Sequence, residues 1–169
     1  MSLSMYRVSI PAFERGFGVL SSYLDKAEAH AQDNGLDPGI LVQARLSPDM
    51  LPLAGQVQRA SDTSKNAIAR LTGMDAPSFP DTESTFAELQ QRIRNTLDFF
   101  AGVEPARLEG SEMREIPLKF GKFQAMLSGD DYLLSFALPN FYFHVATAHG
   151  ILRHQGIQIG KLDYLGPFA

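Results

Sequence analysis

The sequence contains no cysteine among its 169 residues. Because disulfide bonds, thiolate nucleophiles and cysteine-ligated zinc sites all need sulfur, this absence excludes the three together. Any metal ion would have to be held by histidine, aspartate, glutamate or tyrosine. The chain also lacks a glycine-rich phosphate loop and a nucleophile elbow. Its motifs alone therefore indicate no class of enzyme.

Long apolar runs and clusters of basic residues are missing as well. No apolar stretch approaches the roughly 20 residues that a helix needs to cross a bilayer. Residues 1–18 have no basic region leading into an apolar one, so they do not resemble a signal peptide, and we expect a cytoplasmic protein without a membrane partner. With 15 Lys and Arg against 19 Asp and Glu, the net charge is −4, so we expect no nucleic-acid partner.

The size and composition are typical of one globular unit. A chain of 169 residues, 44% apolar and 20% charged, is long enough to bury most of its apolar surface around one core. No internal repeat or low-complexity segment divides it. We therefore expect a single domain over residues 1–169.

Four segments carry apolar residues at the spacing of an amphipathic helix. They span residues 9–35, 47–73, 82–102 and 130–156. The first could begin at Ser9, or extend back to Ser4 and kink at Pro11. The second is expected to begin at Ser47 as N-cap, and between the two Asp37 should cap a short helical turn.

The last two helices carry clearer local signals. Thr85 and Glu88, three residues apart, predict a capping box for the third helix. In the fourth, Pro139 removes a backbone hydrogen bond, which predicts a kink near residues 137–138. Residues 157–169 show no clear element.

Residues 114–120 and 122–127 alternate apolar and polar side chains around Gly121, which predicts a short hairpin. Because an isolated hairpin is marginal in water, we expect it to lie on the helices. The predicted fold class is thus all-α in the main: an antiparallel four-helix bundle with a small β-hairpin between the third and fourth helices.

Three of the four histidines lie in the fourth helix, at steps of five residues: His144, His149 and His154. A helix turns about 100° per residue, so His149 lies roughly 140° from His144, and His154 roughly 80° on the other side. Two ligands that share an ion on one helix usually sit three or four residues apart, and none of these pairs does. The spacing predicts no intrahelical chelate.

His144 is the histidine expected to face the core. The apolar face of the fourth helix lies close to it and is formed by Leu134, Ala137, Phe141, Ala148, Ile151 and Leu152. Two interpretations stay open: a core imidazole satisfied by Asn140, Ser61 or Ser64, or an acid/base group or ligand in an interior pocket. His149 is expected at the edge, His154 near the C-terminal dipole and His30 on the surface.

The second helix could supply the polar wall of such a pocket. Its residues Gln58, Asp62 and Lys65 share one side, next to the small polar positions Ser61 and Ser64. These serines allow either close helix packing or a cavity. Asp62 and Lys65 are spaced as in a surface ion pair, which is the more common role of such a pair than a catalytic dyad.

Two stretches, residues 45–73 and 138–166, carry a family resemblance. They resemble an uncharacterised bacterial family within the DinB/YfiT-like metalloenzyme superfamily, and residues 149–166 are the most specific part. The resemblance implies a four-helix bundle and, in many members, a dimer. It also implies a divalent metal, often nickel or zinc, held by one histidine of the second helix and an HxxxH pair on the last. Some members act with low-molecular-weight thiols.

This sequence departs from that ligand pattern. His144 matches the first histidine of the pair, but Ala148 stands at the second, and the second helix offers only Gln56, Gln58, Ser61 and Thr63 as the nearest polar residues. One imidazole cannot hold zinc or nickel tightly, since protein sites use three or four ligands. We therefore expect the fold to carry over and no metal cofactor to be bound.

Two functions follow from this reading. In the first, the chain is an enzyme or a binding protein for an unknown small molecule, with His144 as the catalytic candidate and Asn140, Gln58, Ser61, Asp62 and Lys65 around the pocket. In the second, it is a non-catalytic homodimeric bundle that acts as a structural or stress-related binding module.

Overall fold

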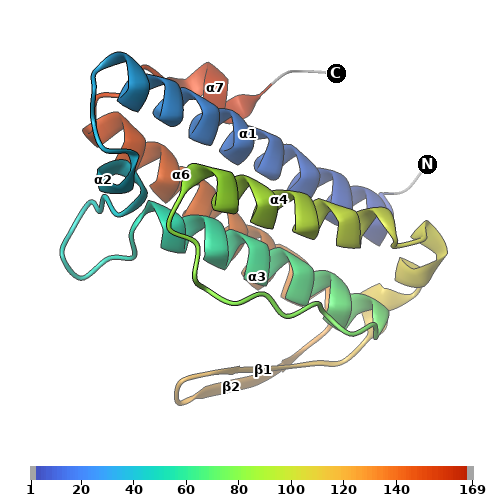
Figure 1. The fold of residues 1–169 in the computed structure, drawn as a ribbon. Coiled ribbons are helices and arrows are strands. Elements are labelled where there is room, and N and C mark those ends of the chain that lie inside the picture. The colour runs from blue at the N-terminus through green and yellow to red at the C-terminus, as the bar shows by residue number, and fades with distance from the viewer. Residues whose placement is uncertain (1–2, 167–169) are drawn as a thin grey trace.

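The computed structural model describes residues 3–166, with Phe120 and Phe123 described by their backbone alone. Four long helices form an antiparallel bundle: α1 (Met5–Asp33), α3 (Leu53–Thr72), α4 (Phe86–Ala101) and α6 (Leu138–His154). The shorter elements are α2 (Pro38–Val42), η1 (Pro105–Leu108), η2 (Ser111–Met113), β1 (Ile116–Phe120), β2 (Phe123–Leu127), α5 (Gly129–Tyr132), η3 (Leu133–Ala137) and α7 (Lys161–Leu165). The predicted fold class is confirmed (Figure 1).

Helix α1 takes the longer of its two expected forms. It begins at Met5, where the Ser4 hydroxyl accepts a hydrogen bond from the Arg7 amide at 3.3 Å, and Pro11 lies inside the helix. The Ser9 hydroxyl donates to the Met5 carbonyl at 2.6 Å instead of capping a helix of its own. The helix ends at Asp33, followed by Gly35 in the left-handed region at φ 63°.

Helix α3 begins five residues later than the sequence predicts. Ser47 does not cap it; its hydroxyl bonds the carboxylate of Asp49 at 2.5 Å, and the helix starts at Leu53 with Pro52 as N-cap. Proline at position 52 cannot donate a helical hydrogen bond and disfavours helical geometry at the residue before it. The chain therefore makes a turn over residues 47–51 before the helix begins.

Three other local predictions are confirmed. The Glu88 amide donates to the Thr85 hydroxyl at 3.2 Å and the Thr85 amide donates to the Glu88 carboxylate at 3.0 Å, which completes the capping box of α4. Asp37 caps α2 through the Gly39 amide at 2.9 Å. Strands β1 and β2 pair antiparallel from Ile116 with Leu127 to the turn, and the hairpin extends from one side of the bundle (Figure 1).

The fourth helix is continuous but widened by one π turn. In η3 the Leu138 amide donates to the Leu133 carbonyl, five residues back, immediately before Pro139. The extra residue in this turn shifts the upstream register, so that Leu133 is buried while Leu134 is 58% exposed. Leu134 was expected on the core face, and that prediction is wrong because a uniform α-helical spacing cannot represent the π turn.

The tail contains an element that the sequence did not reveal. Helix α7 packs beside α1 (Figure 1), and the Asp163 carboxylate both accepts from the Gly160 amide at 2.7 Å and pairs with Lys26 of α1. Five residues with little apolar periodicity give no helical signal by themselves. These two polar contacts hold the turn.

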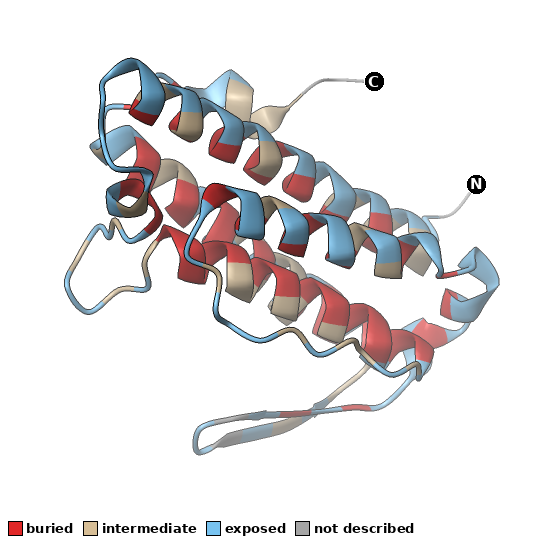
Figure 2. Cartoon of the chain, in the orientation of Figure 1, coloured by how far each residue is buried: buried red, intermediate tan, exposed pale blue. Residues whose placement is uncertain are grey.

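The core runs along the axis of the bundle, and the buried faces of the long helices point toward one another (Figure 2). At its centre the ring of Phe141 lies edge-on to Phe13 at 5.0 Å and to Phe17 at 5.3 Å. A Cβ at Gly16 would lie 2.3 Å from the Phe141 ring, so α1 and α6 approach closely only because position 16 has no side chain. Among the described residues no helix is long and apolar enough to span a bilayer.

Candidate functional site

His144 lies where α6 packs against α3, and only 9% of its surface is exposed. Its Nδ1 is 2.8 Å from Oε1 of Gln56 on α3. Position 56 is one of the four polar positions noted on this helix, and the structure brings it, rather than Gln58, Ser61 or Thr63, against the imidazole. The side chain faces inward, as the sequence pattern indicated.

The hydrogen bonds of Gln56 define the tautomer of His144. Gln56 Nε2 donates to the Leu51 carbonyl at 3.0 Å, so its amide oxygen is the atom that faces the imidazole. Because that oxygen can only accept, His144 Nδ1 must carry the proton, and Nε2 has a free lone pair. Among the described residues no group hydrogen-bonds to Nε2, and this nitrogen is not among the fully buried unpartnered atoms. His144 thus offers one acceptor at the protein surface.

Burial, and to a smaller extent the positive charge of Arg59, lowers the pKa of His144 to about 4. Burial disfavours the charged imidazolium, and no carboxylate compensates. The residue is therefore neutral at pH 7. Nε2 can accept a hydrogen bond, but its low basicity makes it a poor proton acceptor near neutrality.

The expected hydrogen-bond partners of His144 lie elsewhere. Asn140 donates through Nδ2 to the Thr63 hydroxyl at 3.0 Å, one turn along α6. The Ser61 hydroxyl bonds Thr96 of α4 at 2.8 Å, and Ser64 donates to the Ala60 carbonyl at 2.9 Å. Both serines are fully buried and have hydrogen-bond partners, Ser61 on α4 and Ser64 within α3, so the small polar positions serve close helix packing.

An ion network between α3, α4 and residues 79–83 lies apart from His144. It includes Asp62 and Lys65, and Gln58 joins it through a hydrogen bond to Glu83. The Asp62 carboxylate pairs with Lys65 at 2.9 Å, with Arg59 at 2.8 Å and with Arg92 at 3.0 Å. Lys65 is only 5% exposed, so the expectation of a surface ion pair is wrong. The loop between α3 and α4 folds over these side chains, and the sequence pattern of a single helix cannot show such a cover.

Arg92 of α4 is the central cation of this network. It is 2% exposed and also pairs with Asp81 at 3.0 Å and Glu83 at 2.8 Å. Burial raises the pKa of Glu83, but hydrogen bonds from Arg92, its own backbone and Gln58 outweigh this and leave that pKa below its usual value. The basic members are Arg59, Lys65 and Arg92, and the acidic ones are Asp62, Asp81 and Glu83. The charges balance, which suits a structural network.

A small polar hollow lies beside Asn140, between α3 and the start of α6. Its volume is about 200 Å³. We call it the α3–α6 hollow, and its lining comprises Arg59, Asp62, Thr63, Asn66, Arg70, Tyr132, Phe136 and Asn140. Arg59 is also close enough to His144 to influence its pKa. His144 itself does not line the hollow; it lies one helical turn from Asn140, which does.

His149 has a role that sequence reasoning missed. Its Nδ1 lies 2.7 Å from the phenol oxygen of Tyr23, and the ring is half-buried between Tyr23 and Tyr164. Burial raises the pKa of Tyr23, so the phenol keeps its proton and is able to donate a hydrogen bond to His149 Nδ1. Tyr23 lies on α1, 126 residues away in the chain, and no local signal predicts this pairing.

The side chains around His144 do not fit a three-histidine metal centre. Ala148, one turn further along, is fully buried, and Gln56 already holds the Nδ1 proton. Within residues 3–166 no group of three His, Cys, Asp or Glu side chains is placed to hold a metal ion. Of the Gln56 and His144 side chains, only His144 Nε2 has a lone pair that could bind a metal ion. That the protein carries no metal stays a prediction.

Comparisons with known proteins agree with this architecture. Residues 5–165 match the family model described as a domain of unknown function, DUF1993. A crystal structure of a DinB family member from Shewanella denitrificans is 38% identical, covers 97% of this chain and 93% of its own, and superposes with a TM-score of 0.90. A comparison with curated proteins gave no match. The chain therefore belongs to the DUF1993 family and has the fold of a DinB-like protein.

Proposed function

We propose that the protein binds a small polar molecule at the α3–α6 hollow, with His144 as a neutral hydrogen-bond acceptor and without a metal centre. The observation that carries this proposal is the hydrogen bond from His144 Nδ1 to Gln56, because it fixes the tautomer and leaves Nε2 with a lone pair that no described residue takes up. An imidazole held in one tautomer by a neighbouring side chain is a preorganised recognition group.

The hollow adds further groups of known orientation. The Asn140 amide is fixed by its bond to Thr63, which leaves Oδ1 as a second acceptor. Arg70 donates to the Tyr132 phenol at 2.9 Å and lies over its ring, so its guanidinium is held at the wall. A volume of about 200 Å³ suits a few water molecules or a small molecule with hydrogen-bond donors.

Binding fits the residues better than acid/base catalysis does. A general base works best when its pKa is near the working pH, whereas burial holds the pKa of His144 at about 4. Gln58, Ser61 and Lys65 take part in hydrogen bonds or ion pairs away from the imidazole and would contribute stability rather than contacts with the ligand.

A fragment screen followed by histidine side-chain NMR tests the proposal. Small amides, alcohols and carboxylates are added, and the Nε2 resonance of His144 and the melting temperature are recorded. The proposal requires at least one fragment that shifts this resonance and stabilises the wild type, but not His144→Gln. The control is His154→Gln, an exposed position on the same helix. Equal stabilisation of all three proteins would refute the site.

The alternative is a non-catalytic homodimeric bundle, an assembly that the family resemblance implies. Light scattering coupled to size exclusion separates the cases, since the chain alone has a mass of 18.6 kDa. A dimer in which His144→Gln changes no ligand response would favour this structural module. In either case we propose a cytoplasmic location.

A further inference from the structure

One end of the α3–α6 hollow, where Arg70 of α3 meets Tyr132 of α5, gathers hydrogen-bond donors that have no acceptor. Asn66 and Arg70 are four residues apart on α3, which places them on one face of that helix. Tyr132 and Phe136 line the hollow from α5 and η3. We call the part formed by Asn66, Arg70, Tyr132 and Phe136 the Arg70 end. Its donors determine what it can bind.

Tyr132 is the buried member of the Arg70 end. It is 1% exposed although it lines the hollow, and its ring stacks on Phe136 with the centroids 5.8 Å apart. The phenol oxygen accepts a hydrogen bond from Arg70 at 2.9 Å. Burial raises the pKa of this phenol against the opposing charge of Arg70, so the oxygen keeps its proton at pH 7. No described residue accepts that proton, whereas buried donors are generally paired.

Arg70 supplies the charge of this end. Its guanidinium is held by the phenol and lies over the Tyr132 ring, 5.6 Å from the centroid. The bond to Tyr132 uses one of its five N–H groups, and within residues 3–166 no carboxylate pairs with it. The half-buried Asn66, one turn earlier on α3, adds an amide that makes no side-chain hydrogen bond to any described residue. Donors of three residues thus converge here.

The other charges of the hollow are already balanced. Arg59 pairs with Asp62, and both belong to the ion network in which three cations face three carboxylates. Of the charged side chains described in the lining, Arg70 is therefore the one outside an ion pair. A cationic end with unused donors is complemented by an anionic acceptor.

We propose that the Arg70 end of the α3–α6 hollow binds the carboxylate of a small planar acid, with the body of the acid against Phe136. The phenol oxygen of Tyr132 and the nitrogen of Arg70 that bonds it are 2.9 Å apart, so one carboxylate can accept from the phenol and from a second guanidinium N–H. The half-buried ring of Phe136 offers an apolar surface, and a volume of about 200 Å³ restricts the acid to a small one. The inference rests on the proposed function in placing the ligand in the same hollow, but it does not need the imidazole of His144.

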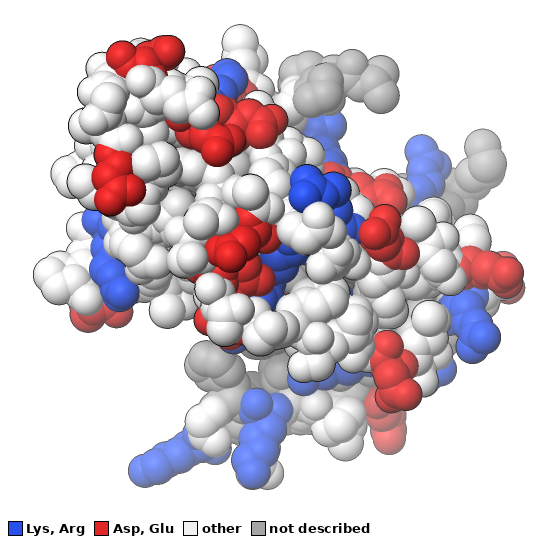
Figure 3. All heavy atoms as spheres, in the orientation of Figure 1, with Lys and Arg blue, Asp and Glu red and all other residues white. Residues whose placement is uncertain are grey.

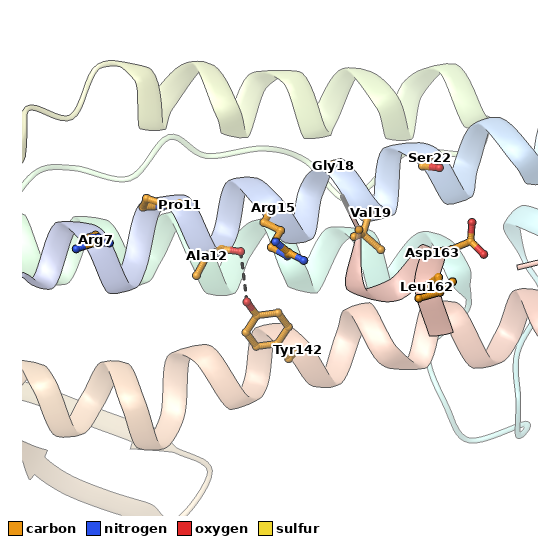
Figure 4. A pocket seen from close by; sticks show the side chains of 11 residues that line it. Arg7, Pro11, Ala12, Arg15, Gly18, Val19, Ser22, Tyr142, Leu162 and Asp163 are labelled. Carbon is orange, nitrogen blue, oxygen red and sulfur yellow. Dashed lines mark hydrogen bonds between the residues drawn. The ribbon is translucent and has the colours of Figure 1, made fainter. Parts of the chain in front are cut away.

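A larger cavity, of about 850 Å³, lies between α1, α6 and α7 and is the competing place for a small acid (Figure 4). Arg7, Arg15 and Gly18 line it from α1 (Figure 4). Arg15 is engaged, since it donates to the Leu165 carbonyl at the end of α7. A Cβ at position 18 would meet nothing within 4 Å, so Gly18→Leu adds a side chain to the open space of this cavity. That variant tells the two cavities apart.

Titration of the full chain with benzoate at pH 7.5, followed by NMR, tests the site, with benzamide as the neutral probe of the same shape. The side-chain amide resonances of Asn66 should shift with benzoate and saturate. Benzamide should bind at least about tenfold more weakly, because it brings no negative charge to Arg70. Arg70→Gln and Tyr132→Phe should each weaken benzoate binding by about tenfold, since each removes one donor to the carboxylate.

Three matched variants should bind benzoate as the wild type does. Arg153→Gln removes the same charge from an exposed position of α6, and Tyr6→Phe removes a phenol of α1 that makes no hydrogen bond to any described residue. Gly18→Leu changes the competing cavity alone. Arg70 is exposed, so the Arg70→Gln protein should fold even if Tyr132→Phe does not.

The inference is overturned if benzoate does not bind, if benzamide binds equally well, or if a folded Arg70→Gln or Tyr132→Phe protein keeps its affinity. Loss of binding in Gly18→Leu would overturn it as well, because the acid would then occupy the larger cavity. The proposed function is judged separately, by whether the effect of a fragment depends on His144. Benzoate should bind His144→Gln normally, whereas an amide or alcohol that needs His144, together with no binding of benzoate, would refute this inference and leave the proposed function standing.

Discussion

Oε1 of Gln56 on α3 accepts the Nδ1 proton of His144 on α6 at 2.8 Å, across 88 residues of chain. This contact ties together the two helices that carry metal ligands in the superfamily that the sequence resembles. The contact is a hydrogen bond between two neutral side chains. The first two predictions concern this pair.

Folding should become less favourable as the pH falls from about 6.5 to about 4, and His144 should cause part of that loss. The unfolded imidazole takes up its proton near pH 6.5, whereas burial lowers the folded pKa to about 4. The unfolded state binds more protons in this window, so stability is present above pH 6.5 and declines below it, by about 1–3 kcal/mol for this residue. Urea unfolding of the wild type and His144→Gln at pH 7.5 and 4.5 measures the difference. An identical pH dependence in the two proteins would contradict the prediction.

Gln56→Glu should raise the pKa of His144. A carboxylate at hydrogen-bond distance favours the charged imidazolium, which opposes the effect of burial. We expect His144 to titrate well above pH 4 in this variant, as measured from its ring resonances by NMR. Gln56→Leu removes the partner without adding charge and should leave the imidazole neutral at pH 7. A Gln56→Glu protein with an unchanged titration would mean that the two side chains do not meet in solution.

Asp62→Asn should destabilise the protein by about 3 kcal/mol, because it leaves two buried cations without one of their partners. Lys65 is 5% exposed and its recorded ion pair is with Asp62, while Arg92 is 2% exposed. Lys26→Met breaks the pair with Asp163, whose side chains are 43% and 30% exposed, and should cost less than about 1 kcal/mol. Denaturant unfolding measures both. Comparable losses would show that the network is solvated.

Gly16→Ala and Gly18→Ala should move stability in opposite directions. The new methyl group at position 16 would lie 2.3 Å from the Phe141 ring, and overpacking of this kind costs about 1–3 kcal/mol. At position 18 it meets open space, so helix propensity should add up to about 1 kcal/mol. Thermal melts of the two variants test the pair, and a stable Gly16→Ala protein would mean that α1 and α6 lie further apart.

Protein purified without an affinity tag should contain far less than one equivalent of nickel or zinc. Gln56 and Ala148 leave His144 as a single imidazole, and tight zinc sites need three or four ligands. Elemental analysis by mass spectrometry gives the answer directly. Stoichiometric metal that disappears in His144→Gln would restore a metal centre at this position.

Local signals predicted the fold well. The capping box of α4, the cap of α2 and the alternation around Gly121 are each short-range patterns, and each formed as expected. The wrong predictions concern a helix start and a helix face that are set by features outside the repeating apolar pattern. Pro52 delays the start of α3, and a π turn moves Leu134 out of the core.

The candidate site was less accessible to sequence reasoning. The inward direction of His144 follows from helical periodicity, but its contact with Gln56 depends on how α3 and α6 pack. Asp62 and Lys65 read as a surface pair because the loop that covers them carries no periodic signal. The cavity between α1, α6 and α7 could not be foreseen, since it depends on α7, a helix of five residues.

The π turn of η3 also sets how the residues of α6 are rotated about the helix axis relative to α5. Deleting one residue from 133–137 would restore α-helical hydrogen bonding and rotate α6 by about 100° relative to α5. Either the imidazole of His144 would move away from the Gln56 amide, or α5, which follows the hairpin, would have to pack differently against the bundle. A single widened turn thus decides, two turns downstream, which side chain the second half of the helix presents to its neighbour.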